Sequence, residues 1–340
     1  MNNKQRTTTK SIVFIIIFLI LIGSLLFYAW RGIYLPKNPN SKEEKIFTIQ
    51  KGEGTREISS SLEKQGFIQW GPLFRIYTHT KGIAGKLQAG EYSISPSMTI
   101  PEIVEKFVDG DVVKIMVTIP EGFTINDIEK RLIENGLDIN SEIKTKKAEL
   151  YKNEFQFLAS LPDDFNLEGY LFPDTYQFSY RITPEEIVKK MLSNLDQKLT
   201  SNLREEISHQ GKSIFEIITM ASLIEKEVKT FEDKKIVSGI LWKRIENNMP
   251  LQVDATISYI TGGKSNQISV EETKIDSPYN TYKYRGLPLG PICNPGLESI
   301  MAAVYPKSSD YWYYLSTPDG QTIFSKTFDE HIKAKEKYLK

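Results

Sequence analysis

The sequence is poor in the side chains that form cross-links or bind metals. Only one of its 340 residues is cysteine, Cys293, and only three are histidine. A single cysteine excludes an internal disulfide, so stability must come from a buried core. The histidines, His79, His209 and His331, are far apart and form no ligand-spaced pair. We therefore expect no metal site, no cofactor and no Ser-His-Asp catalysis.

The chain also lacks an excess of charge of either sign. Lys plus Arg and Asp plus Glu each number 43, so the formal net charge is zero. A nucleic-acid-binding domain carries a basic patch or excess, because contacts to phosphate supply much of its affinity. The composition therefore predicts no nucleic-acid partner.

One long uncharged run is present near the N-terminus. Residues 11–30 (SIVFIIIFLILIGSLLFYAW) contain no charged side chain. A helix of about 20 apolar residues spans the roughly 30 Å hydrocarbon core of a bilayer, whereas the apolar part of a secretory signal has only about 7–15 residues. No A-x-A-like cleavage site follows. The run predicts a retained transmembrane anchor, and a helix buried in a soluble core is the alternative.

The flanks of this run predict its orientation. Lys4, Arg6 and Lys10 precede it without any acidic residue, which indicates a cytoplasmic tail at residues 1–10. Tyr28 and Trp30 stand where an interfacial aromatic belt belongs. We expect a single-pass protein of the cell membrane, with the large C-terminal part extracytoplasmic. Residues 31–45, rich in Pro, Asn, Ser and Lys, predict a linker.

A repeated pattern follows the linker. FTIQKGEGTREISSSLEKQGFI from Phe47 and VTIPEGFTINDIEKRLIENGLD from Val117 align without a gap, and a partial third copy begins at Ile94. Each copy predicts a short strand, a glycine turn and an amphipathic helix ended by glycine. These units, at residues 46–140, are similar to LysM-type glycan-binding modules. The alternative is that their repeated apolar residues only fill small cores.

Residues 141–340 predict a mixed α/β domain, so the expected fold class is α+β. Ser213 and Glu216 form a capping box that begins a helix reaching Lys229. The apolar stripe of residues 234–247 predicts a second helix, and residues 184–203 predict another. Residues 142–161 are mostly polar and are also expected to be helical. A hairpin over residues 312–325, turning at Pro-Asp-Gly, precedes a last helix.

The capped helix carries two carboxylates, in TMASLIEKEV. An apolar environment raises the pKa of a carboxyl group, and a Glu that is neutral at physiological pH is a general acid. Glu225 falls within the apolar arc with Lys229 four residues beyond it, which predicts a structural carboxylate. Glu227 falls at the edge of the arc without a local cation, which favours it as the acid. Helix geometry leaves open the reverse assignment, or Glu227 as a solvated surface residue.

Three more segments are dense in aromatic, turn-forming and hydrogen-bonding residues: LEGYLFPDTYQF, LQVDATISY and SPYNTYKYRGLPLGPICNPG. Aromatic faces stack on the C–H faces of sugars, whose hydroxyls require polar partners. Such ordered, polar loops suggest a binding surface, and buried hinges or connectors are the alternative. The candidate substrate-binding residues are Glu168, Asp174, Tyr176, Gln252, Asp254, Tyr279, Asn280, Thr281 and Tyr282.

The order of the anchor, the LysM-like modules, LEGYLFPDTY, ASLIEKEV, LQVDATISY and YNTYKYRGLPLGPICNPG resembles the membrane-anchored endolytic murein transglycosylases (YceG-like). The resemblance implies cleavage of peptidoglycan glycan strands at N-acetylmuramic acid to give 1,6-anhydro ends, with Glu227 as the catalytic acid. It implies glycan strands as substrate and a YceG-like catalytic domain. Val228 follows the acid where other lytic transglycosylases have Ser or Thr.

This chemistry is consistent with one acid. Ordinary glycosidases use two carboxylates, one of them a nucleophile or a base that activates water. A C6 hydroxyl of the substrate that attacks its own sugar removes the need for an external water. Two other functions stay open: a non-catalytic glycan-binding scaffold that positions cell-wall synthases, and a conventional hydrolase.

Overall fold

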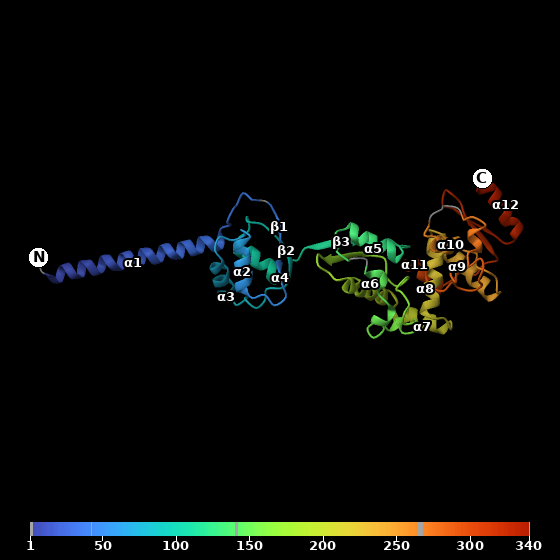
Figure 1. Ribbon diagram of the computed structural model, residues 1–340, viewed down its shortest axis with the longest axis horizontal. Coiled ribbons are helices and arrows are strands. Elements are labelled where there is room, and N and C mark those ends of the chain that lie inside the picture. Colours follow the sequence, from blue (N-terminus) through green and yellow to red (C-terminus); the bar gives the residue numbers. More distant parts are fainter. Residues whose placement is uncertain (1–2, 42, 140–141, 264–267, 340) are drawn as a thin grey trace. The chain divides into compact units, whose positions relative to one another are not determined.

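The computed structural model describes residues 3–41, 43–139, 142–263 and 268–339, with side chains from residue 12 onward (Figure 1). The basic side chains predicted to be cytoplasmic therefore lie outside the described residues. The α-helices are α1 (Asn3–Tyr34), α2 (Thr55–Lys64), α3 (Gly71–Thr80), α4 (Ile100–Asp109), α5 (Ile125–Glu134), α6 (Pro184–Lys198), α7 (Ser201–His209), α8 (Ile214–Glu227), α9 (Phe231–Glu246), α10 (Asp254–Thr261), α11 (Leu297–Val304) and α12 (Phe328–Tyr338). The strands are β1 (Lys45–Ile49), β2 (Gly90–Ile94), β3 (Lys114–Thr118), β4 (Thr175–Ser179), β5 (Tyr313–Ser316) and β6 (Thr322–Ser325). Single 3-10 turns occur at Ile143–Thr145, Ala148–Leu150, Gln156–Leu158 and Glu272–Lys274.

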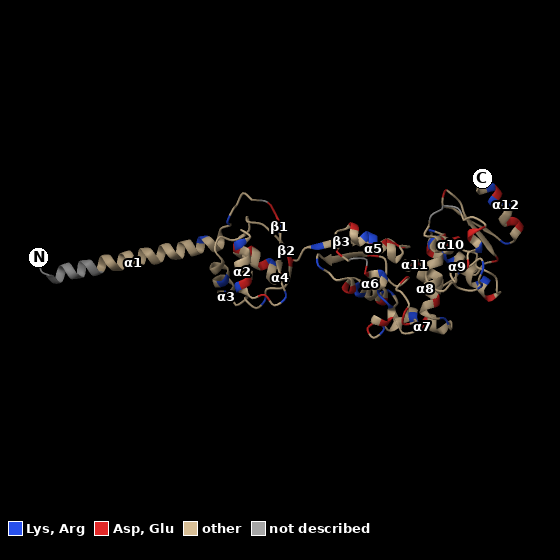
Figure 2. Ribbon diagram, viewed as in Figure 1, with Lys and Arg blue, Asp and Glu red and all other residues tan. Residues whose placement is uncertain are grey.

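The first helix, α1, has a candidate membrane span at Ile12–Tyr34, in which an 18-residue window has a mean hydropathy of 3.0. Within the described part of the chain, it is the one helix long and apolar enough to cross a membrane. Figure 2 shows no charged side chain along its described part until Arg31. The helix continues past Arg31, where the sequence predicts a linker, because Ala29 and Ile33 pack against the core of the domain that follows.

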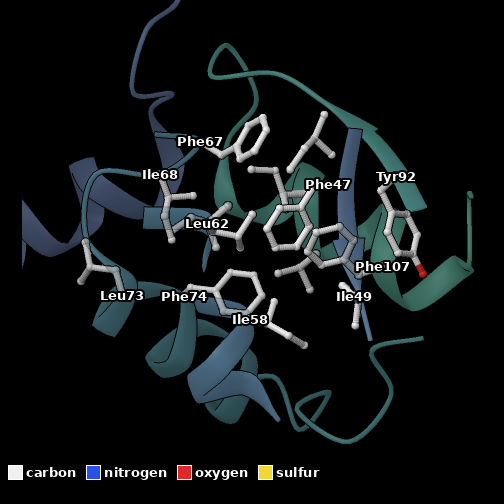
Figure 3. Packing of buried hydrophobic residues seen from close by; sticks show 14 residues of the cluster. Phe47, Ile49, Ile58, Leu62, Phe67, Ile68, Leu73, Phe74, Tyr92 and Phe107 are labelled. Atoms are coloured by element: carbon white, nitrogen blue, oxygen red, sulfur yellow. The ribbon is translucent and has the colours of Figure 1, made fainter. Parts of the chain in front are cut away.

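The chain forms two compact units, residues 1–115 and 116–340. In unit 1, strands β1 and β2 pair antiparallel, with Lys45 opposite Ile94. Helices α2 and α3 connect them, and α4 follows. Figure 3 shows the core that these elements enclose, in which the ring of Phe47 stacks on Phe107 at 5.6 Å. Burial of these rings and of the aliphatic side chains around them stabilises the small unit.

The predicted repeat exists as local structure but not as one domain. In both full copies a strand is followed by a glycine in the left-handed region, Gly52 (φ 91°) or Gly122 (φ 77°), and then by a helix. The first copy, β1 and α2, belongs to unit 1, whereas β3 pairs with β4 and α5 belongs to unit 2. The boundary at 115/116 therefore differs from the predicted 140/141. A local pattern does not specify which strand pairs with which.

Helix α8 is the central element of unit 2, and α9, α10, α11 and α7 pack on it. All its residues from Ile217 to Ile224 are buried. The predicted capping box is present: the Ser213 hydroxyl accepts from the Glu216 amide at 3.1 Å, and the Glu216 carboxylate accepts from the Ser213 amide at 2.8 Å. The helix ends at Glu227, because Val228 has an extended backbone (φ −145°).

Other predictions for unit 2 hold in part. The hairpin and the last helix are confirmed as β5, β6 and α12. The single helix predicted for residues 184–203 is wrong: α6 ends at Lys198, and α7 begins after Thr200, whose hydroxyl accepts from the Leu203 amide at 3.4 Å. The polar segment 142–161 contains only single 3-10 turns in its described residues. The observed fold is mixed, with helices and small two-stranded sheets, as the α+β prediction requires.

Candidate active site

A cavity of about 940 Å³ opens in unit 2 beside the C-terminal end of α8. Glu227 and Asp254 line it together with Glu168 and Tyr279, and the start of α5 contributes Thr124. These residues come from separate segments of the chain. The fold therefore brings parts of all three polar motifs to the end of the helix that carries the two carboxylates.

Glu227 is the last residue of α8, and its half-buried side chain faces this cavity. The carboxylate has hydrogen bonds with the Tyr314 hydroxyl and the Ala255 amide. Burial, and to a smaller extent the negative charge of Asp254, raises the pKa of Glu227, whereas Tyr314, Ala255 and Arg244 lower it. The net pKa is about 7. The group can therefore carry or release a proton near neutral pH.

Strand β5 supplies two side chains that interact with Glu227. The Ser316 hydroxyl donates to the Glu227 carbonyl oxygen at 2.9 Å, and Tyr314 on the same strand reaches the carboxylate. Val228, at the position where the family resemblance implies a hydroxyl, is buried and only 5% exposed. In this chain strand β5 brings the Tyr314 and Ser316 hydroxyls near Glu227.

Arg244 on α9 supplies the positive charge near Glu227 that local sequence lacks. Its Nη1 donates to the Leu251 carbonyl at 2.7 Å, and its Nε and Nη2 donate to the Trp312 carbonyl at 3.0 and 2.7 Å. The guanidinium is 5% exposed and joins α9 to the segments before α10 and β5. Sequence reasoning missed both Arg244 and Tyr314. The one available signal was an arginine within the apolar stripe of α9.

Asp254 begins α10 and accepts a hydrogen bond from the Tyr282 hydroxyl. Two residues earlier, Gln252 has a left-handed backbone (φ 53°), a strained conformation for this residue. Its amide donates to the Thr281 carbonyl at 3.1 Å, while its side chain is exposed. The strained turn thus orients the first residue of α10 toward the cavity.

Asn280 and Thr281 are buried, the first bonded within its own loop and the second to the segment at the start of α10. The Asn280 amide group donates to the Ile275 carbonyl at 2.8 Å and accepts from the Tyr282 amide at 2.9 Å. The Thr281 hydroxyl accepts from the Val253 amide at 3.0 Å. These two predicted substrate-binding residues shape the loop, with fully enclosed side chains, and they place Tyr282 beside the acid.

Glu168 lies against the start of α5 and is 4% exposed. Its carboxylate accepts from the Ile125 amide at 3.1 Å and from the Asn294 side chain at 3.0 Å. Burial raises the pKa of Glu168 to about 8. Nearby, the Tyr279 ring packs against Tyr259, with centroids 5.1 Å apart. Glu168, Tyr259 and Tyr279 line the same cavity as Glu227.

Asp174 and Tyr176 lie elsewhere in unit 2. They line a separate hollow, where the Asn194 amide donates to the Asp174 carboxylate at 2.9 Å and to the Tyr176 hydroxyl at 3.0 Å. The Tyr176 hydroxyl donates to the Phe172 carbonyl at 2.5 Å. The structure thus does not bring this pair to the cavity that contains Glu227.

Glu225 has the partners of a structural carboxylate. Its Oε2 accepts from the Ser299 hydroxyl at 2.5 Å and from the Gly296 amide at 3.1 Å, and it pairs with Lys234 at 3.4 Å. The side chains of this ion pair are only 9% and 4% exposed. The predicted partner, Lys229, is wrong, because the chain leaves the helix at Val228 and the next helix supplies the cation.

A cavity that contains readily protonated carboxyl groups, Glu227 at the end of α8 and the more deeply buried Glu168, has the features of a general-acid site. The chain belongs to the YceG-like family, whose profile matches residues 47–337. This confirms the resemblance at the level of the family.

Individual relatives agree. The chain is 33% identical over 332 residues to the endolytic murein transglycosylase of Bacillus subtilis (strain 168), covering 94% of this chain and 91% of that protein. It is 30% identical over 352 residues to the protein of that name from Streptococcus pneumoniae serotype 2, covering 94% of this chain but 63% of the pneumococcal protein. A crystal structure of a Listeria monocytogenes protein described as YceG-like has a TM-score of 0.60 and 33% identity, covering 86% of this chain and all of that one.

Proposed function

We propose that the chain is an endolytic peptidoglycan lytic transglycosylase in which Glu227 is the general acid and base. The observation that carries the proposal is the Glu227 carboxyl group, with a pKa raised to about 7, at the large cavity of a YceG-like chain. The names of the relatives supply the reaction class. The substrate is the glycan strand of peptidoglycan, cleaved at N-acetylmuramic acid.

In the first step Glu227 gives its proton to the glycosidic oxygen, and the bond between C1 and that oxygen breaks. The substrate's acetamido group stabilises the oxocarbenium-like centre. In the second step the Glu227 carboxylate takes the proton of the C6 hydroxyl, whose oxygen bonds to C1 to form the 1,6-anhydro ring. Tyr314 and Arg244 favour the carboxylate that exists between the two steps, whereas Asp254 favours the protonated form that begins and ends the cycle.

We also propose that α1 is a retained single-pass anchor with a cytoplasmic N-terminus, so that both units are extracytoplasmic. A cleaved signal helix does not contribute to the mature core. The last turns of α1 pack Ala29 and Ile33 against the core of unit 1, which supports retention. The enzyme would then act on strands near the membrane surface, where cell-wall synthases are candidate partners.

The product of the reaction tests the assignment. Purified protein incubated with glycan strands is expected to release fragments that end in 1,6-anhydro-N-acetylmuramic acid, detected by mass spectrometry. A conventional hydrolase would release reducing ends that incorporate oxygen from labelled water. A glycan-binding scaffold would bind the strands and release no fragment. Either of these two results would contradict the proposal.

The pH dependence of turnover should respond in opposite directions to two neighbours of the acid. The reaction starts from protonated Glu227, so activity is expected to fall as the pH rises through about 7. Tyr314→Phe removes a hydrogen bond that lowers the pKa of Glu227 and should shift this alkaline limb to higher pH. Asp254→Asn removes a charge that raises this pKa and should shift the limb to lower pH. Profiles of kcat/KM against pH measure both, and shifts in the same direction would contradict the assignment.

The predicted glycan-binding role of unit 1 is a separate proposal. Deletion of residues 47–110 removes most of unit 1 and leaves the cavity residues of unit 2 in place. We expect the deletion to lower affinity for insoluble cell wall while turnover of short soluble strands is kept. Co-sedimentation with purified wall measures the first and product release the second. Unchanged sedimentation would reduce unit 1 to a spacer.

A further inference from the structure

Helix α3 of unit 1 lies alongside the end of α1. A Cβ atom at Gly32 would clash with the Leu73 side chain, so the two helices are in close contact there. Two residues farther along α1, the ring of Tyr34 meets the ring of Tyr77 edge-on, with centroids 6.3 Å apart. Glycine at position 32 permits this close approach.

Trp70, immediately before α3, lies beside a part of α1 that precedes Gly32. Tyr28, Arg31 and Trp70 line one hollow of about 390 Å³. Successive residues of α1, from Tyr28 to Tyr34, therefore meet successive residues of the α3 segment in the same order, from Trp70 to Tyr77. At 1.5 Å per residue both stretches rise by about 10 Å. The two helices run in the same direction, and Trp70 marks the end of α3 that points back along the apolar helix.

The level of Trp70 coincides with the expected edge of the hydrocarbon core. The apolar span of α1 begins at Ile12, and about 20 residues of helix cross the roughly 30 Å core. The core then ends near Arg31. Trp70 is 52% exposed, and beside it Tyr28 is 62% exposed. Trp and Tyr concentrate at this depth, because their rings are apolar and their N–H or O–H groups reach water.

We propose that the edge of unit 1 formed by Gln69 and Trp70 docks into the phospholipid headgroup layer on the outer face of the membrane. The proposal rests on the proposed anchoring role of α1. Because Ala29 and Ile33 of α1 pack against the core of unit 1, the anchor and the docked edge form one rigid body. Unit 1 is then held upright at a fixed height on the bilayer, where a flexible linker would let it tumble.

Because the sequence has one cysteine, a cysteine introduced elsewhere can be labelled with little background. Cys293 is fully buried, so the thiol of a Trp70→Cys variant is the accessible one. The variant is reconstituted as the full chain in vesicles of phosphatidylcholine and phosphatidylglycerol, and a nitroxide is attached. Collision rates with oxygen, which partitions into lipid, and with a water-soluble nickel chelate then report depth. Gln69→Cys provides a second position on the same edge.

Two matched positions complete the experiment. Strand β1 lies away from the entry of α1 into unit 1 (Figure 1). Ile46 on this strand is 46% exposed, and Ile46→Cys reports an aqueous surface of the same unit. Leu21→Cys reports the middle of the anchor. We expect the ratio of oxygen to nickel collisions at positions 69 and 70 to lie severalfold above that at 46 and below that at 21.

Labels at 69 and 70 that match 46, with a lipid-buried label at 21, would overturn the docking alone. A water-exposed label at 21 would overturn the anchor and the docking together, and product release in the same vesicles would show whether the proposed activity stands.

Discussion

Glu227→Gln is expected to lower turnover by roughly 10²–10⁴-fold, because the amide keeps the shape of the side chain but cannot deliver or accept the proton. The measurement is the rate at which 1,6-anhydro ends appear from glycan strands. Folding should be intact, since the guanidinium of Arg244, the cation near Glu227, keeps its hydrogen bonds to the Leu251 and Trp312 carbonyls. Glu246→Gln, at the exposed C-terminal end of α9, is the matched control and should retain full activity.

Glu227→Gln should also change the way in which the stability of the protein depends on pH. The pKa of Glu227 rises from its ordinary 4.5 to about 7 on folding, so between these pH values the folded state binds more protons than the unfolded state. The contribution of Glu227 to stability therefore falls as the pH rises from 4.5 to 7. Glu227→Gln lacks this dependence, and its melting temperature relative to the wild-type protein should increase across that range. An active Glu227→Gln variant would remove Glu227 from the mechanism.

Glu225→Gln is expected to act on folding. It removes the charge that pairs with Lys234 and leaves a buried ammonium group without its ion-pair partner, a change that costs about 3–5 kcal/mol when one partner of a buried pair is lost. Chemical denaturation measures the loss. Turnover per folded molecule should remain, because Glu225 faces Gly296 and Ser299 instead of the cavity.

A surface pair provides the control for this result. Glu271 and Lys274 form an ion pair at 2.8 Å with side chains 82% and 63% exposed, so Glu271→Gln should change stability by only about 0–1 kcal/mol. Replacing Lys234 by Met in the Glu225→Gln background should recover part of the stability, since no buried charge then remains. A normally stable but inactive Glu225→Gln beside an active Glu227→Gln would exchange the roles of the two carboxylates.

Local sequence determined several elements of this protein and narrowed the proposed acid to two residues. The apolar run of α1, the Ser213 capping box and the Pro-Asp-Gly hairpin each depend on contacts between residues a few positions apart, which a sequence states directly. The different positions of Glu225 and Glu227 on one helix follow from its periodicity for the same reason. The ordered motifs also indicated the family.

Only the tertiary structure decided which residues meet. The partner of Glu225 is Lys234 on the next helix, α9, in place of Lys229. The neighbours of Glu227 are Arg244, also on α9, and Tyr314 on β5, far along the chain. The separation of the two repeat copies into different units likewise depends on which strand β3 pairs with. These contacts form when buried polar groups and strand edges must find partners in a packed core, and that choice depends on the whole chain folding at once. Local periodicity therefore placed the acid on its helix, while long-range packing made its environment.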